Sequence, residues 1–185
     1  MPFKQFIAIP VFIAFQAFTM MALARFVPLT GQAAGGGLTT WIAFQAWAMY
    51  FLGGCTIKMA GKTIVGYVGG IVASVAIFEL AGVFGALSAG ATPWGLYLAV
   101  FIVVIFVICV ERIPGCDFVP AYFIGAGVFF ALFTYLPKPD EVAKYTWYLN
   151  LAVPEIVACV IGLAYGWWTV TTRTWYEARI AKPKA

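Results

Sequence analysis

The sequence contains no histidine, and only 10% of its 185 residues are charged. Without histidine, His-ligated haem, His-based metal sites and histidine proton relays are excluded. No nucleotide-binding motif is present, so ATP is not expected to drive the protein. The cysteines are too scattered to form a C-x-x-C pair, which argues against a metal cluster or a redox motif: Cys55, Cys109, Cys116 and Cys159. We therefore predict no metal and no cofactor.

Apolar residues dominate the chain, at 64% of the total, and the mean hydropathy is +0.97. Soluble domains are about half apolar, so this excess predicts a membrane protein. A spanning helix needs about 20 residues, so the length accommodates about six helices and no separate soluble domain. The run from Phe6 to Leu23 is longer than a typical signal sequence and lacks a cleavage site, so we expect a retained first helix. The predicted fold is an all-α bundle forming one transmembrane domain over residues 1–185.

Turn-forming residues separate six apolar runs. The predicted spans are residues 4–27, 39–59, 63–87, 93–112, 118–136 and 148–172. With the N-terminus inside, eight basic residues fall on the inner side: Lys4, Lys58, Lys62, Arg112, Arg173, Arg179, Lys182 and Lys184. Three fall outside: Arg25, Lys138 and Lys144. Positive charge marks the cytoplasmic face, so both termini are predicted to be cytoplasmic.

The net charge of +4 follows this topology, and we expect no nucleic-acid partner. Residues 173–185 form a short basic tail that we expect to lie against anionic headgroups of the lipid bilayer.

Three charged residues, Glu111, Arg112 and Asp117, lie close together between the fourth and fifth runs. Asp117 is a plausible N-cap for the fifth helix, whose first turn tolerates Pro120. Two interpretations remain open. The segment is either a tight inner turn, or a cytoplasmic mouth lined by Asp117 and the start of the fifth helix.

Two carboxylates, Glu79 and Glu155, lie inside apolar runs, where an ionisable group is costly and functional by default. The spans place both in the outer half of the bilayer, at similar depth. Pro154 leaves the carbonyl of Asn150 without its helical donor, which predicts a local polar cluster. We expect both carboxylates to face protein rather than lipid.

Three further polar residues are candidates within the spans: Arg25, Gln16 and Gln45. Arg25 is expected to pair with one of the carboxylates, or to extend to the headgroups. Gln16 falls in mid-span, where one amide can hold helices together. These residues form either structural pairs or the lining of a pathway.

Small residues recur at four-residue spacing, which lets helices approach closely. The pairs are Gly66 with Gly70, Ala81 with Gly85, and Gly162 with Gly166. They serve either the internal bundle or a subunit interface, and we expect a homo-oligomer, with other membrane subunits as further possible partners.

Two segments, "FLGGCTIKMAGKTIVGYVGGIVAS" and "FVPAYFIGAGVFFA", together resemble bacterial domain-of-unknown-function family 1097. The likeness covers about residues 38–172. It rests on Gly54, Cys55, Gly61, Lys62, Phe118, Val119, Pro120, Phe123, Ile124, Gly125 and Ala126. The resemblance implies a multi-spanning protein of the bacterial inner membrane, and no established activity. The sequence also contains a weak internal repeat. Gly-Cys precedes the third and the fifth predicted helix, and Tyr67 and Gly69 in the third correspond to Tyr122 and Gly125 in the fifth.

Two functions remain open. The first is a channel or facilitator for a small neutral or weakly charged solute, because buried charges are few. The second is a non-catalytic accessory or scaffold subunit that organises a membrane assembly. An enzyme is the weakest reading, since no nucleophile or metal site is evident.

Overall fold

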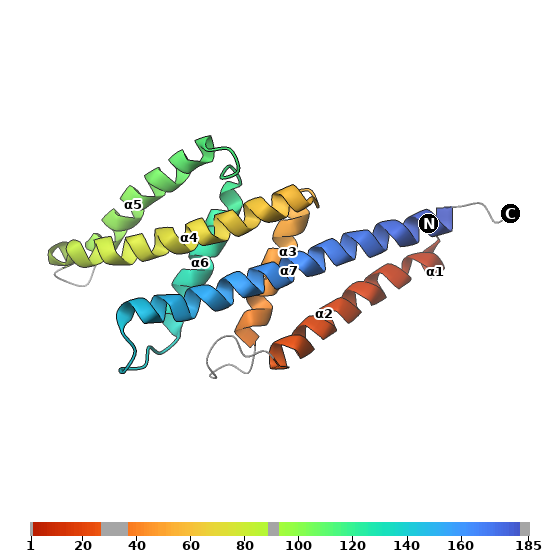
Figure 1. The fold of residues 1–185 in the computed structure, drawn as a ribbon, viewed down its shortest axis with the longest axis horizontal. Coiled ribbons are helices and arrows are strands. Elements are labelled where there is room, and N and C mark those ends of the chain that lie inside the picture. Colours follow the sequence, from red (N-terminus) through yellow and green to blue (C-terminus); the bar gives the residue numbers. More distant parts are fainter. Residues whose placement is uncertain (1, 27–36, 89–92, 182–185) are drawn as a thin grey trace. The chain divides into compact units, whose positions relative to one another are not determined.

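The computed structural model describes residues 2–26, 37–88 and 93–181, and for residues 24–26 and 37–39 it describes the backbone alone. The described residues are helical apart from short turns (Figure 1). The helices are α1 (Phe3–Phe6), α2 (Ala8–Phe26), α3 (Gly37–Leu52), α4 (Ile57–Val83), α5 (Trp94–Cys109), α6 (Val119–Tyr135) and α7 (Lys144–Ala181). Two short 3-10 turns, η1 (Gly85–Ser88) and η2 (Val110–Arg112), complete them. The predicted all-α fold is confirmed for this part of the chain.

Each predicted span corresponds to one helix, with α1 and α2 sharing the first. The break between these two lies at Ile7. Pro10 has no N–H to donate to the carbonyl of Phe6, which weakens the helix at this point. Among the residues that the structure describes, four segments are long and apolar enough to cross a membrane: Phe3–Leu23, Ile57–Val83, Trp94–Arg112 and Lys144–Ala181. The remaining two helices are shorter, α3 with 16 residues and α6 with 17.

The turn before α4 differs from the prediction. The predicted spans leave residues 60–62 for the turn, but these residues belong to the first turns of α4. The chain reverses earlier, at Gly54 and Cys55, which have positive φ angles of 81° and 61°. Glycine adopts a positive φ angle without a steric penalty, so Gly54 favours a chain reversal at this point. Lys58 and Lys62 therefore project from a helix rather than from a loop.

Helix α7 is longer than predicted at both ends. It has 38 residues, about 57 Å at 1.5 Å per residue, and includes residues 173–181 of the expected basic tail. Its buried residues form one stripe at three- and four-residue spacing. The stripe comprises Tyr148, Leu151, Pro154, Glu155, Ala158, Cys159, Gly162, Leu163, Gly166 and Thr169. Pro154 lies inside the helix.

The single domain predicted from the sequence divides into two compact units, residues 1–57 with 158–185, and residues 58–157. In the first unit, α2 and the end of α7 are antiparallel. Tyr165 bonds Thr19, Thr169 bonds Gln16, and the Tyr176 hydroxyl donates to the carbonyl of Gln5 over 2.8 Å. Helix α1 and the last turns of α7 therefore lie at the same end of this unit.

Close contacts between backbones join α3 to α7 in the same unit. A Cβ added at Gly162 would meet the backbone of Ala43, and one at Gly166 would lie 2.7 Å from Cβ of Tyr50. The two helices run parallel here, because both residue numbers increase together. Glycine is required at these two positions, and the pair predicted from the sequence serves this internal contact.

In the second unit, α4 and α6 run parallel. A Cβ at Gly66 would meet Ala121, and Ser74 lies 3.3 Å from the carbonyl of Ala126. Two contacts are reciprocal, since the Tyr122 ring covers Gly69 and the Tyr67 backbone covers Gly125. The two segments that carry the family resemblance thus pack directly on each other. The weak internal repeat in the sequence corresponds to these two reciprocal contacts between a tyrosine and a glycine.

Candidate functional site

A buried polar cluster lies between α2, α3 and α7 in the first unit. We call Gln16, Thr19, Trp47, Tyr165 and Thr169 the Gln16 cluster. The Thr169 hydroxyl lies 2.8 Å from Oε1 of Gln16. The Tyr165 hydroxyl lies 3.2 Å from Oγ1 of Thr19, which itself donates to the Gln16 carbonyl. The Gln16 side chain is fully buried, so these groups interact away from solvent.

The amide of Gln16 has unused hydrogen-bonding capacity. Thr169 has one hydroxyl hydrogen but two acceptors at 2.8 Å, the Gln16 amide oxygen and the carbonyl of Tyr165. If Thr169 donates to Tyr165, a rotated amide donates from Nε2 to Thr169 and leaves its oxygen unused. If Thr169 donates to Gln16, Nε2 has no partner among the described residues. In either orientation one polar group of the amide is available to a ligand.

A second unused donor belongs to Trp47. Its ring packs against Tyr165 with centroids 5.8 Å apart, and its indole N–H is buried without a partner among the described residues. Leaving such a group unbonded costs about 1–3 kcal/mol. Two buried polar groups of this cluster, on Gln16 and Trp47, therefore have no hydrogen-bond partner among the described residues.

Sequence reasoning identified only one member of this cluster. Gln16 stands out because an amide in an apolar run is conspicuous, whereas threonine and tyrosine hydroxyls in a helix are ordinary. Gln45, the other predicted glutamine, is exposed on α3 and does not take part. The two glutamines differ in burial, and their burial depends on how the helices pack, which the sequence alone does not show.

Glu155 is fully buried, as predicted, and neither carboxyl oxygen has a hydrogen-bond partner among the described residues. The Asn150 side chain is exposed, and Glu155 makes no hydrogen bond to the Asn150 carbonyl that Pro154 was predicted to free. Five residues along a helix turn the side chain through about 140° from its starting direction, so the two point to different faces. Glu155 is thus an isolated polar group within the core of the second unit.

Glu79 has partners that differ from the predicted one. Its Oε1 lies 2.7 Å from Nζ of Lys144 and accepts a 3.2 Å hydrogen bond from Tyr148. The Arg25 side chain, the expected partner, lies outside the described residues. Lys144 precedes Glu155 by eleven residues, about 16 Å along α7. Glu79 and Glu155 therefore lie beside different parts of α7, and Glu79 belongs to a half-exposed ion pair.

The predicted cytoplasmic mouth corresponds in part to a pocket of about 510 Å³ in the second unit. Asp117 lines it opposite Lys62, whose Nζ lies 2.6 Å from both carboxylate oxygens. Asp117 makes no capping bond to α6. Glu111 and Arg112 are exposed in η2 and do not line this pocket. The full lining is Lys58, Gly61, Lys62, Val65, Pro114, Gly115 and Asp117.

The ion pair makes stability depend on pH in acid. The hydrogen bond from Lys62 holds the pKa of Asp117 below its ordinary value. Its contribution is therefore complete above the ordinary aspartate pKa of about 3.9 and is lost as the pH falls through the lower folded value. Asp117→Asn should lower the Tm in detergent slightly at pH 7, and the difference from wild type should disappear at strongly acid pH. An equal difference at both pH values would contradict this assignment.

The small-residue pairs on α4 and α7 are internal contacts of the two units. Gly66 and Gly70 lie against α6, as Gly162 and Gly166 lie against α3. The third pair is different, because Gly85 begins η1 outside α4 and a Cβ there would meet no described atom within 4 Å. Ala81 and Gly85 therefore do not form a helix-packing pair within the described protomer.

The described chain thus combines helices that are apolar and long enough to suggest a membrane protein, close packing at glycine, and a buried polar cluster. The chain belongs to the family described as "Protein of unknown function (DUF1097)", whose model matches residues 7–173. No curated protein and no solved structure matches the chain. The matched range includes both glycine-rich segments and all five residues of the Gln16 cluster.

Proposed function

We propose that this protein is a membrane facilitator for a small, uncharged, polar solute that hydrogen-bonds to the Gln16 cluster. The observation that carries the proposal is the pair of buried, unpartnered groups, the Gln16 amide and the Trp47 indole N–H. A passing solute with both an acceptor and a donor, such as a short amide or urea, would satisfy them. Hydrogen bonds between these neutral groups and the solute are weak enough for the solute to dissociate again.

The charge of the cluster supports a neutral solute. Its five residues are glutamine, threonine, tryptophan and tyrosine, and the cluster contains no acidic or basic residue. An ion bound here would lose its hydration shell without gaining an opposite charge, which is costly in an apolar interior. A neutral amide loses much less on dehydration, because the cluster replaces its hydrogen bonds.

The proposed setting is the bacterial inner membrane, with both termini cytoplasmic. The distribution of lysine and arginine supports this orientation. The antiparallel α2 and α7, joined near the chain ends by Tyr176 and Gln5, are consistent with an even number of spans. We also propose a homo-oligomer with a non-catalytic role. Because glycine pairs on α4 and α7 are used internally, subunit contacts would use other surfaces.

The test is a flux assay in proteoliposomes. We expect the wild type to accelerate entry of urea, formamide or acetamide, measured by stopped-flow light scattering, more than entry of formate. Ammonia and water are measured in parallel, because acceleration of water alone would assign the cluster to water. Gln16→Leu removes at least one hydrogen bond to the solute, worth about 1 kcal/mol, and should lower flux per folded protein about fivefold or more.

Gln45→Leu is the matched control, because it makes the same chemical change at an exposed position of α3. It should leave flux unchanged. Equal loss in both variants, or wild-type flux no greater than that of empty liposomes, would contradict the facilitator.

The alternative, an accessory or scaffold subunit, has one observation in its favour. In the second unit α5 exposes a broad apolar surface, which includes Trp94, Leu98, Phe101, Ile105 and Phe106. In a membrane such a face contacts lipid or another subunit. Absence of flux, together with a stable complex containing this chain, would favour this role.

A further inference from the structure

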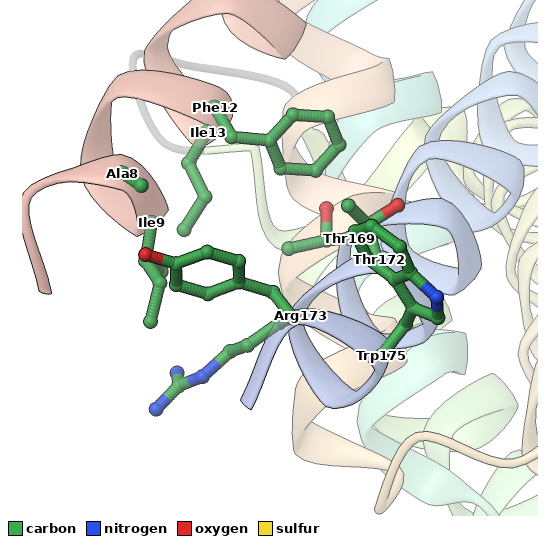
Figure 2. Close-up of a pocket in the computed structure, with 9 residues that line it drawn as sticks. Ala8, Ile9, Phe12, Ile13, Thr169, Thr172, Arg173 and Trp175 are labelled. Carbon is green, nitrogen blue, oxygen red and sulfur yellow. The ribbon is translucent and has the colours of Figure 1, made fainter. Parts of the chain in front are cut away.

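A small apolar pocket lies between the start of α2 and the end of α7, within the first unit. Its volume is about 120 Å³. Figure 2 shows Ala8, Ile9, Phe12 and Ile13 on the α2 side, and Thr169, Thr172, Arg173 and Trp175 on the α7 side. The surface that lines the pocket is almost entirely apolar, although four residues with polar groups take part in it: Thr169, Thr172, Arg173 and Tyr176. Such a cavity does not hold water well and accepts a hydrocarbon group instead.

One basic residue, Arg173, takes part in the pocket, and further basic residues are close to it in the sequence. Arg173 is part of its lining, and about half of its side chain is exposed. Among the described residues it makes one ion pair, from Nε to Glu177 at 2.9 Å, which leaves the two terminal guanidinium nitrogens available. The sequence from residue 173 onward contains four basic residues and one acidic residue. Lys4 adds another positive charge beside Gln5, whose carbonyl binds Tyr176 at the pocket.

The two features together fit one class of ligand. An acidic phospholipid has a hydrocarbon chain for the apolar pocket and a phosphate for the guanidinium, which binds phosphate through paired hydrogen bonds. Trp175, in the lining, is of the type enriched at the boundary between hydrocarbon and headgroups. We propose that the pocket between α2 and α7 binds one acidic phospholipid, with an acyl chain against Ile9 and Phe12 and its phosphate on Arg173.

The experiment measures lipid retention by native mass spectrometry. The full-length protein is purified in detergent with equal amounts of phosphatidylglycerol and phosphatidylcholine. We expect phosphatidylglycerol to be retained in preference, with one molecule per protomer. In detergent no charged bilayer surface is present, so an arginine contributes to lipid retention only if it contacts the bound lipid directly. Arg173→Gln should lower the retained fraction about fivefold, the effect of one cation near a headgroup.

Two controls separate this site from a generally basic tail. Arg179→Gln removes the same charge six residues further along α7, where the guanidinium lies over the Trp175 ring but does not line the pocket, and should change retention less than twofold. Ala8→Phe fills the pocket and should also lower retention, whereas Ala14→Phe changes an exposed position outside it and should not. Equal losses for Arg173→Gln and Arg179→Gln, or full retention in Ala8→Phe, would overturn the proposal.

Discussion

Gly125→Ala is expected to lower the free energy of unfolding by about 1–3 kcal/mol, the usual effect of overfilling a packed core. A Cβ at Gly125 would lie 2.6 Å from Cα and 2.8 Å from the carbonyl oxygen of Tyr67. These are backbone atoms of α4, so no side-chain rotation can make room. The two helices must separate, which also loosens the contacts of Gly66 and Gly70 with α6.

Gly127→Ala is the matched control, two residues along the same helix. Gly127 is exposed, and a Cβ there would meet nothing within 4 Å. Alanine has the higher helix propensity, so this variant should be more stable by up to about 1 kcal/mol. Both can be measured by unfolding in SDS. The same sign of change in both variants would show that α4 and α6 are not packed as described.

Glu155→Met is expected to raise the free energy of unfolding by about 1–3 kcal/mol. The carboxyl of Glu155 is fully buried without a hydrogen-bond partner among the described residues, and such burial costs this much in mutational data. Methionine has a similar length and flexible apolar atoms, so it can fill the same space. The measurement is SDS unfolding, with solute flux recorded on the same preparation.

Glu79→Gln should change stability in the opposite direction. It removes the charge that pairs with Lys144 and keeps a group that can still bond Tyr148. We expect a small decrease in Tm, because the pair is half-exposed and partly screened by solvent.

If Glu155→Met is instead destabilising, Glu155 has a bonding partner beyond the described residues, and its isolation in the core is wrong.

The order and number of helices could be predicted from the sequence because long apolar runs, interrupted by glycine and proline, leave few alternatives. The boundaries were less predictable. Lys58 and Lys62 suggested a loop, but the left-handed conformation at Gly54 and Cys55 places the reversal before them. Similarly, the polar tail from residue 173 suggested an irregular segment, although it continues α7 to Ala181. Polar residues can extend a helix once its first turns are formed.

The candidate sites were predictable only as single residues. Glu155 and Gln16 were conspicuous because polar groups are rare in apolar runs, and both are buried. Their surroundings depend on how helices distant in the sequence pack, which composition does not reveal. Lys144 was assigned to an outer loop, so its pairing with Glu79 was missed. Lys62 and Asp117 were assigned to separate turns, and only the parallel packing of α4 and α6 brings them together.

The length of α7 has a practical consequence for imaging. A hydrocarbon core is about 30 Å thick, whereas α7 extends continuously for about 57 Å, so even a tilted helix leaves several turns outside it. A small membrane protein offers little mass for aligning particle images. A soluble helical protein joined in register at Ala181, without a flexible linker, would continue the same helix and provide a rigid marker outside the detergent.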